Sequence, residues 1–190
     1  NGVIGEEYAE PQGRITVLFP SFDDVADGVW YQDAVGWAAS RGITTGATET
    51  AFDPNALCTR AHILTFLWRA AGQPDSTLEN PFTDLSGSEY YYSAALWAYE
   101  QGLIEGSVFD ADAPCLRSDV VTYLWQLSGS PVLSGQSGFD DVSADAPYAH
   151  AVLWAVDSGI TTGASETTFE PDGTCTRAEI VTFLYRHFAL

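Results

Sequence analysis

The chain has 190 residues, enough for one domain or a group of small ones with a substantial buried core. Its charge is lopsided, because 26 Asp and Glu face seven Arg and no Lys, which gives a net charge of −19. Nucleic acids and anionic membranes attract proteins through basic faces, so bulk electrostatic binding to either is excluded.

Apolar residues make up 46% of the sequence, which indicates a well-filled core. No apolar run approaches the roughly 18 residues that a membrane span needs. Because the sequence starts at Asn1 and contains no Met, we expect it to be part of a longer primary product.

The sequence contains one unit of about 60 residues three times. The copies align on a Phe, a Trp, a Gly, a second Phe and an Arg. In chain order these are Phe22, Trp37, Gly46, Phe52 and Arg60; Phe82, Trp97, Gly106, Phe109 and Arg117; and Phe139, Trp154, Gly163, Phe169 and Arg177. The second copy is three residues shorter between its Gly and its second Phe, which predicts a surface loop there. We therefore expect a lead-in segment (1–20) and three repeats, numbered 1 to 3 (21–73, 81–130 and 138–190), joined by Pro-containing linkers.

Each repeat predicts a helix, a loop and a second helix. Helical spacing of apolar residues places the first helices at about 30–41, 90–101 and 148–158. Each of these ends at a Gly suited to a left-handed cap, at Gly42, Gly102 and Gly159. The second helices start near Thr59, Leu116 and Thr176 and carry dense apolar faces. Since one such helix pair cannot bury both faces alone, the repeats are expected to pack on one another as an all-α body with pseudo-threefold symmetry.

An Arg lies in the first turn of each second helix. The Thr-Arg-Ala-Glu stretch that starts at Thr176 predicts a capping box, which explains its Thr and Glu. It does not explain the Arg, because a cation at a helix N-terminus opposes the helix dipole at a cost of about 0.3–1 kcal/mol. Two explanations stay open. One is an ion pair with a carboxylate such as Asp24, Asp84 or Asp141, and the other is an anion site formed by the guanidinium and the helix N–H groups.

Other residues also allow a structural and a functional interpretation. The Trp at the centre of each first helix is either a core residue, which is the more common case, or a ligand platform. Trp30-Tyr31 and Tyr90-Tyr91 flank helix entrances and could present their rings to a sugar. Cys58, Cys115 and Cys175 are equivalent and are interpreted as buried apolar residues, because no CxxC pair or nearby His supports a metal site. The three His fall at unrelated positions and are interpreted as surface residues: His62, His150 and His187.

No catalytic set emerges from the sequence. Nucleophile elbows, phosphate loops and zinc-protease motifs do not occur in it. Asp23-Asp24 and Asp140-Asp141 are paired carboxylates, but their position before a helix favours turn and cap roles. We therefore expect a protein that is not an enzyme and has no cofactor.

The motif order Phe-x-Asp-Val, Trp-Tyr, Ala-Val-x-Trp-Ala, Gly-Ile-Thr-Thr-Gly, Phe-x-Pro and Thr-Arg-Ala-Glu, taken three times, resembles three tandem S-layer homology repeats over about residues 20–190. The resemblance implies a three-pronged spindle around a central helical bundle. It also implies non-covalent anchoring of an exported protein to the Gram-positive cell envelope. The ligand implied is a secondary cell wall polysaccharide with a terminal pyruvylated N-acetylmannosamine, bound in grooves between adjacent repeats.

The family's binding residues carry over to six positions here: Arg60, Arg117, Arg177, Gly46, Gly106 and Gly163. Aromatic residues at the helix entrances are expected to face the sugar, at Trp30, Tyr90 and Tyr148. The copies also depart from the pattern, since repeat 1 has His62 in place of the capping acid, repeat 2 has lost its Thr, and repeat 3 has Pro147 in place of the usual Trp.

The resemblance thus predicts an extracellular, wall-associated module, monomeric with internal symmetry, with no nucleic acid partner and no membrane insertion. The alternative prediction is a surface-exposed protein-interaction module, in which the same grooves or aromatic residues hold a host or envelope protein.

Overall fold

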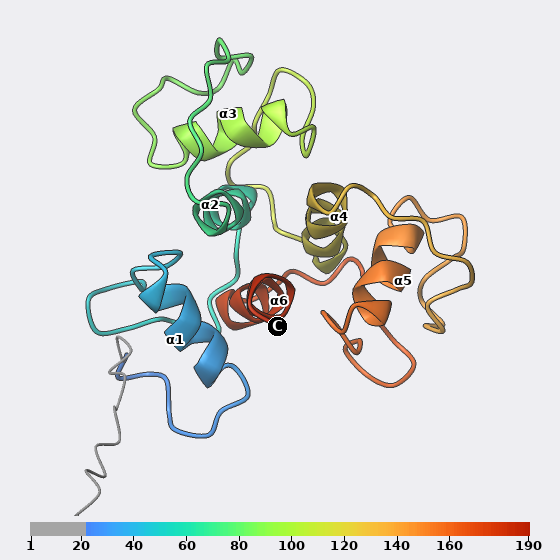
Figure 1. Cartoon of the computed structure of the whole chain (residues 1–190). Helices are drawn as coiled ribbons and strands as arrows, with labels where there is room; N and C mark the ends of the chain where they lie inside the picture. The colour runs from blue at the N-terminus through green and yellow to red at the C-terminus, as the bar shows by residue number, and fades with distance from the viewer. Residues whose placement is uncertain (1–21) are drawn as a thin grey trace, which may run out of the picture.

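The computed structural model describes residues 22–190, which form six α helices (Figure 1). These are α1 (Gln32–Ser40), α2 (Arg60–Ala70), α3 (Tyr92–Glu100), α4 (Arg117–Leu127), α5 (Ala149–Asp157) and α6 (Arg177–Phe188). Over this range only isolated β-bridges accompany the helices, so the predicted all-α class is confirmed. Within the same residues no helix combines the length and apolarity needed to cross a bilayer. The predicted lead-in segment, 1–20, lies outside the described residues.

The helices are arranged around a centre formed by α2, α4 and α6 (Figure 1). Helix α6 contacts both α2 and α4, and each of the outer helices, α1, α3 and α5, packs on one central helix. Helix α3 packs on α2, α5 packs on α4, and α1 packs on α6. Each outer helix therefore packs on the central helix of the preceding repeat, and repeat 1 closes the ring on repeat 3. This arrangement is consistent with the expected three-pronged spindle.

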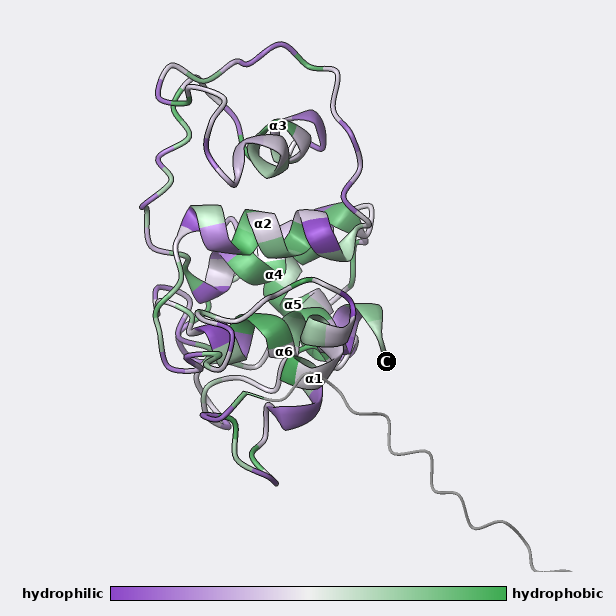
Figure 2. Cartoon of the chain, turned by 90° about the vertical axis from the view of Figure 1, so that its left-hand side faces the viewer, coloured by the Kyte–Doolittle hydropathy of each residue, from purple (hydrophilic) through white to green (hydrophobic). Residues whose placement is uncertain are grey.

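The apolar faces of the central helices explain why they lie inside. Apolar residues run along α2, α4 and α6, whereas many connecting segments are hydrophilic (Figure 2). The fully buried side chains of these helices include Ile63, Leu67, Leu124, Ile180 and Leu184. Because burial of such a side chain is worth about 1.5–3 kcal/mol, the shared face provides a strong driving force for packing the repeats together.

The Trp of each outer helix belongs to the core. Trp97 and Trp154 are buried, and Trp37 is half-buried with its ring centroid 5.7 Å from that of Tyr185 on α6. The core interpretation therefore holds for these three residues. The Gly residues that follow the outer helices have φ angles of 68° to 70°, as predicted for left-handed caps.

The three Cys lie at the points where the repeats meet. Their backbones form a closed ring of hydrogen bonds, because the N–H of Cys58 donates to Cys175, that of Cys115 to Cys58, and that of Cys175 to Cys115, at 2.9–3.0 Å. The thiols are buried and unpaired, which confirms the interpretation as small buried residues. Burial raises the pKa of Cys58 to about 11 and raises the pKa of the other two thiols as well. The ring therefore joins the three segments that precede the central helices.

Candidate ligand-binding site

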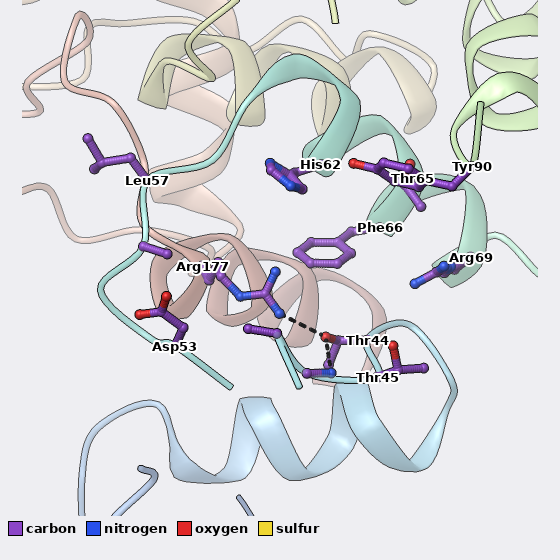
Figure 3. A pocket seen from close by; sticks show the side chains of 13 residues that line it. Thr44, Thr45, Asp53, Leu57, His62, Thr65, Phe66, Arg69, Tyr90 and Arg177 are labelled. Atoms are coloured by element: carbon purple, nitrogen blue, oxygen red, sulfur yellow. Dashed lines mark hydrogen bonds between the residues drawn. The ribbon is translucent and has the colours of Figure 1, made fainter. Parts of the chain in front are cut away.

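A pocket of about 460 Å³ opens beside the start of α6 (Figure 3). All three repeats contribute to it. Repeat 1 supplies the loop after α1 and one side of α2, repeat 2 supplies Tyr90, and repeat 3 supplies Arg177. The pocket thus brings together Gly46, Tyr90 and Arg177 of the predicted site residues and adds Thr44, His62 and Arg69.

Arg177 is the charged centre of this pocket, although its side chain is only 9% exposed. Its Nε donates to the carbonyl of Phe52 at 2.7 Å, and its Nη2 donates to Oγ1 of Thr44 at 3.2 Å. The guanidinium carbon lies 4.9 Å from the ring centroid of Phe52 and 5.5 Å from that of Phe66. Burial lowers the pKa of Arg177, but a guanidinium remains protonated in proteins.

Both protein acceptors of Arg177 are neutral. A guanidinium has five N–H donors, and the two hydrogen bonds described above engage only part of them. Among residues 22–190 the one ion pair joins Arg117 to Glu179, so Arg177 has no carboxylate partner within that range. A buried cation without a counter-ion is costly, and an anionic ligand in the pocket would relieve that cost.

The side chains of the other two equivalent Arg also reach a backbone carbonyl of the next repeat. Arg60 donates to the carbonyl of Phe109, and Arg117 donates through Nε to that of Phe169 at 2.8 Å. These acceptors are the counterparts of Phe52, so the three Arg form a cyclic pattern. None of them pairs with the acids considered from the sequence, because the described ion pair is to Glu179 instead.

Those acids hold the loops that receive the Arg side chains. The two carboxylate oxygens of Asp24 accept the backbone N–H groups of Phe52 and Asp53, at 2.8 and 2.7 Å. Asp84 and Asp141 bind the equivalent pairs of N–H groups in repeats 2 and 3. Asp24 and Asp141 lie in turns, as predicted, but they do not cap the helix that follows, since each binds backbone N–H groups of residues 28 and 29 positions later.

The helix N–H groups are not free to bind an anion. The N–H groups of Arg177 and Ala178 donate to the carbonyls of Ala56 and Pro54, both at 3.0 Å. The first two N–H groups of α2 and α4 are occupied in the same way by loop carbonyls. The prediction that helix N–H groups take part in an anion site was therefore wrong, because loop carbonyls already occupy them. The groups left for an anion at this site are side chains.

The three Gly predicted for the site differ in what surrounds them. A Cβ at Gly46 would lie 2.4 Å from the carbonyl oxygen of Thr48 and 2.6 Å from the Phe22 ring, and Gly163 is equally confined. At Gly106 nothing lies within 4 Å, although its φ of 91° is still left-handed. The shortened loop of repeat 2 therefore lacks the close packing found in the other two, and it is exposed as predicted.

His62 was missed by the sequence analysis, which placed all three His on the surface. It is half-buried, lines the pocket, and its Nδ1 accepts the backbone N–H of Thr59 at 3.1 Å. Asp119 and Glu179 accept the equivalent N–H groups of α4 and α6, at 3.0 and 2.8 Å. His62 thus replaces the capping acid of α2, and its position three residues after Thr59 was the available signal.

The predicted aromatic residues fall into two groups. Trp30 and Tyr90 are 63% and 61% exposed, and each packs edge-on against the following Tyr. Tyr148 is half-buried and packs against the core, because it occupies the repeat position of that following Tyr. Pro147 stands at the exposed position in repeat 3, so two repeats present an exposed ring and the third does not.

Several known proteins are similar to this chain. An amylopullulanase of Thermoanaerobacterium thermosulfurigenes is 29% identical over 175 residues, which cover 87% of this chain and 9% of the enzyme. An exoglucanase, XynX, of Acetivibrio thermocellus is 28% identical over 87% of this chain and 16% of its own length. An endo-1,4-beta-xylanase A of Thermoanaerobacterium saccharolyticum is 34% identical over 45% of this chain and 7% of its own length. The chain therefore spans less than a fifth of each relative.

The family comparison gives matches at two places, which lie in repeats 1 and 3 and contain the corresponding Arg-bearing helix starts at Arg60 and Arg177. Residues 21–64 and 138–181 of this chain thus match the S-layer homology domain.

Proposed function

We propose that this chain is a non-catalytic module of three S-layer homology repeats that attaches a longer exported protein to the cell wall. Its ligand is an acidic wall polysaccharide, and the pocket at Arg177 binds a carboxylate of that polysaccharide. The observation that carries this proposal is the buried guanidinium of Arg177, which has two neutral acceptors and no acid partner among residues 22–190.

The chemistry of the pocket suits a sugar that carries a pyruvyl ketal. The guanidinium of Arg177 lies among the residues that line the pocket (Figure 3), and its remaining N–H donors can hold a carboxylate in a charge-assisted pair. Arg69 lines the same pocket and supplies a second positive charge. Tyr90 offers an exposed ring face to the apolar side of a sugar, while the hydroxyl of Thr44 is placed beside Arg177.

The comparisons support an attached module. Two segments match the S-layer homology domain, and the relatives named above are enzymes that share only a small part of their length with this chain. A shared segment of this kind is what a module linked to different catalytic domains would give. The net charge of −19 opposes non-specific attraction to an anionic wall, so recognition would rest on local sites such as this pocket.

Co-sedimentation with purified Gram-positive cell wall tests the proposal. The wild-type chain should sediment with wall that carries its polysaccharide and should stay in solution when the polysaccharide, or its pyruvyl group alone, has been removed. Arg177→Gln should weaken sedimentation at least about tenfold, because a charge-assisted pair is lost. Sedimentation that does not depend on the polysaccharide would contradict the proposal and favour a protein partner in the wall.

A further inference from the structure

The surroundings of the three equivalent Arg are not alike. We infer that the Arg177 pocket is the one strong carboxylate site among residues 22–190, because the residue three positions after the helix N-cap decides whether the neighbouring Arg is available to a ligand. That residue is His62 beside Arg177, Asp119 beside Arg60 and Glu179 beside Arg117. The inference rests on the proposed function and adds which of the sites binds.

At Arg117 a carboxylate of the protein already lies beside the guanidinium. Oε1 of Glu179 lies 2.8 Å from Nη1 of Arg117, whose side chain is 7% exposed. Oε2 of Glu179 accepts the N–H of Thr176 at the same time, so the carboxylate is held from both sides. A ligand carboxylate would have to displace Glu179 before it could pair with Arg117. The surroundings of Arg117 otherwise resemble those of Arg177, since Arg186 binds the carbonyl of Ile160 as Arg69 binds that of Ile43.

The surroundings of Arg60 lack the groups that assist binding at Arg177. Repeat alignment puts Ile104 where Thr44 supplies its hydroxyl, and Gln126 where Arg69 supplies its charge. Asp119 is held at the helix start by the N–H of Leu116, next to Arg60. A negative charge thus remains near the guanidinium, while the second positive charge is absent.

The Arg177 pocket combines the favourable features. His62 caps α2 through Nδ1, which acts as an acceptor only in the neutral ring, so the cap adds no negative charge. Burial and the nearby Arg177 lower the pKa of His62, in keeping with a neutral ring at neutral pH. Asp53 also lines this pocket, but acids occupy its position in all three repeats, at Asp53, Asp110 and Glu170, and so do not distinguish the pockets.

Exchange of the deciding residues tests the inference by titration calorimetry on the 190-residue chain. The probe is the methyl glycoside of pyruvylated N-acetylmannosamine, and the same glycoside without the pyruvyl group is the control. The wild-type chain should bind about one equivalent of the probe. His62→Glu should lower its affinity at least about tenfold, because the introduced carboxylate would meet Arg177 as Glu179 meets Arg117. Glu179→Gln should add a second site, since Gln still caps the helix but carries no charge.

Two controls separate these effects from net charge and from changes in folding. His150→Glu introduces the same acid at an exposed His outside the pocket, so it should keep the wild-type affinity within about threefold. His62→Glu completes a standard capping box, so its thermal midpoint should not fall below that of the wild type. Equal binding at two or three sites in the wild type, or unchanged affinity in His62→Glu, would overturn the inference and leave the proposed function standing. A wild type that ignores the pyruvyl group would overturn both.

Discussion

Arg117 and Arg177 have the same place in their repeats and the same kind of carbonyl acceptor, yet their charges are balanced differently. Both guanidinium groups lie between two Phe rings, at 4.9–5.5 Å from the ring centroids. Among the described residues, 22–190, Arg117 meets a carboxylate, that of Glu179, and Arg177 meets none. Because a buried charge needs compensation, the presence of His62 at the position of Glu179 leaves the charge of Arg177 without the carboxylate that Arg117 has.

At this scale Gly46 and Gly106 form a matched pair for mutation. Gly46→Ala forces a Cβ against a backbone oxygen and the Phe22 ring, in addition to the left-handed φ of 85°, so we expect a loss of about 3 kcal/mol in unfolding free energy. Gly106→Ala meets open space and should cost about 1–2 kcal/mol for its backbone conformation alone. Urea unfolding of both variants measures the difference. Equal losses would show that the close contacts at Gly46 relax without cost.

The elements are linked by the acids that precede each outer helix. Asp24, Asp84 and Asp141 reach across to the loop before the next central helix and bind two N–H groups each. The residue after each bound Phe has a left-handed φ of 53° to 58°, as at Asp53. These bonds therefore fix the loop conformation that places the Phe carbonyl in front of the Arg.

Stability should depend on pH through these three acids. Burial raises the pKa of Asp24, but the N–H donors outweigh it, so that its pKa lies below the ordinary 3.8; the same holds for Asp141. A lowered folded-state pKa gives stability that is present above about pH 4 and is lost as the pH falls through the folded-state value. Asp24→Asn should lower the unfolding free energy by about 1 kcal/mol at neutral pH, because the group is exposed and its charge is screened. It should also reduce the loss of stability that the wild type shows as the pH falls below about 4. Urea midpoints from pH 7 to about pH 2 measure this.

The neighbouring acid provides the control for that experiment. Asp23→Asn removes the same charge one residue away, and the Asp23 side chain takes no part in binding the Phe52 and Asp53 N–H groups. Asp23→Asn should therefore lose stability at low pH as the wild type does. Equal pH profiles for Asp23→Asn and Asp24→Asn would assign the effect to net charge and not to the bound N–H groups.

The helices were predictable because their signals are local. Apolar periodicity, the Gly that ends each outer helix and the Thr or Leu before each central helix all act within a few residues. The partner of Arg177 was not predictable, because its acceptor Phe52 lies 125 residues away and is chosen by closure of the ring. The pocket was not predictable for the same reason, because its residues come from three repeats that meet only when the ring closes. The repeat draws attention to Arg177, and the family resemblance names Arg177 and Gly46 as expected binding residues.

In the whole molecule the sequence repeat and the packing unit are different. Each outer helix packs on the central helix of the preceding repeat, and α1 of repeat 1 packs on α6 of repeat 3. The first and last described helices are thus joined by contact, and the candidate pocket lies where that closure is made. Binding at Arg177 should therefore require the closed ring, because Arg177 reaches Phe52 and Thr44 only when repeats 1 and 3 meet.

Circular permutation and truncation should separate ring closure from chain order. A permuted chain that starts at residue 138, continues to 190 and is joined by a long Gly-Ser linker to 22–130 keeps every helix contact of the ring. It should unfold in urea in a single transition near the wild-type midpoint and should retain wall binding. The truncated chain 22–130 leaves α1 without α6. Its helical circular dichroism should fall by more than the removal of α5 and α6 alone accounts for. A truncated chain that keeps its helices and its midpoint would show that the repeats fold independently.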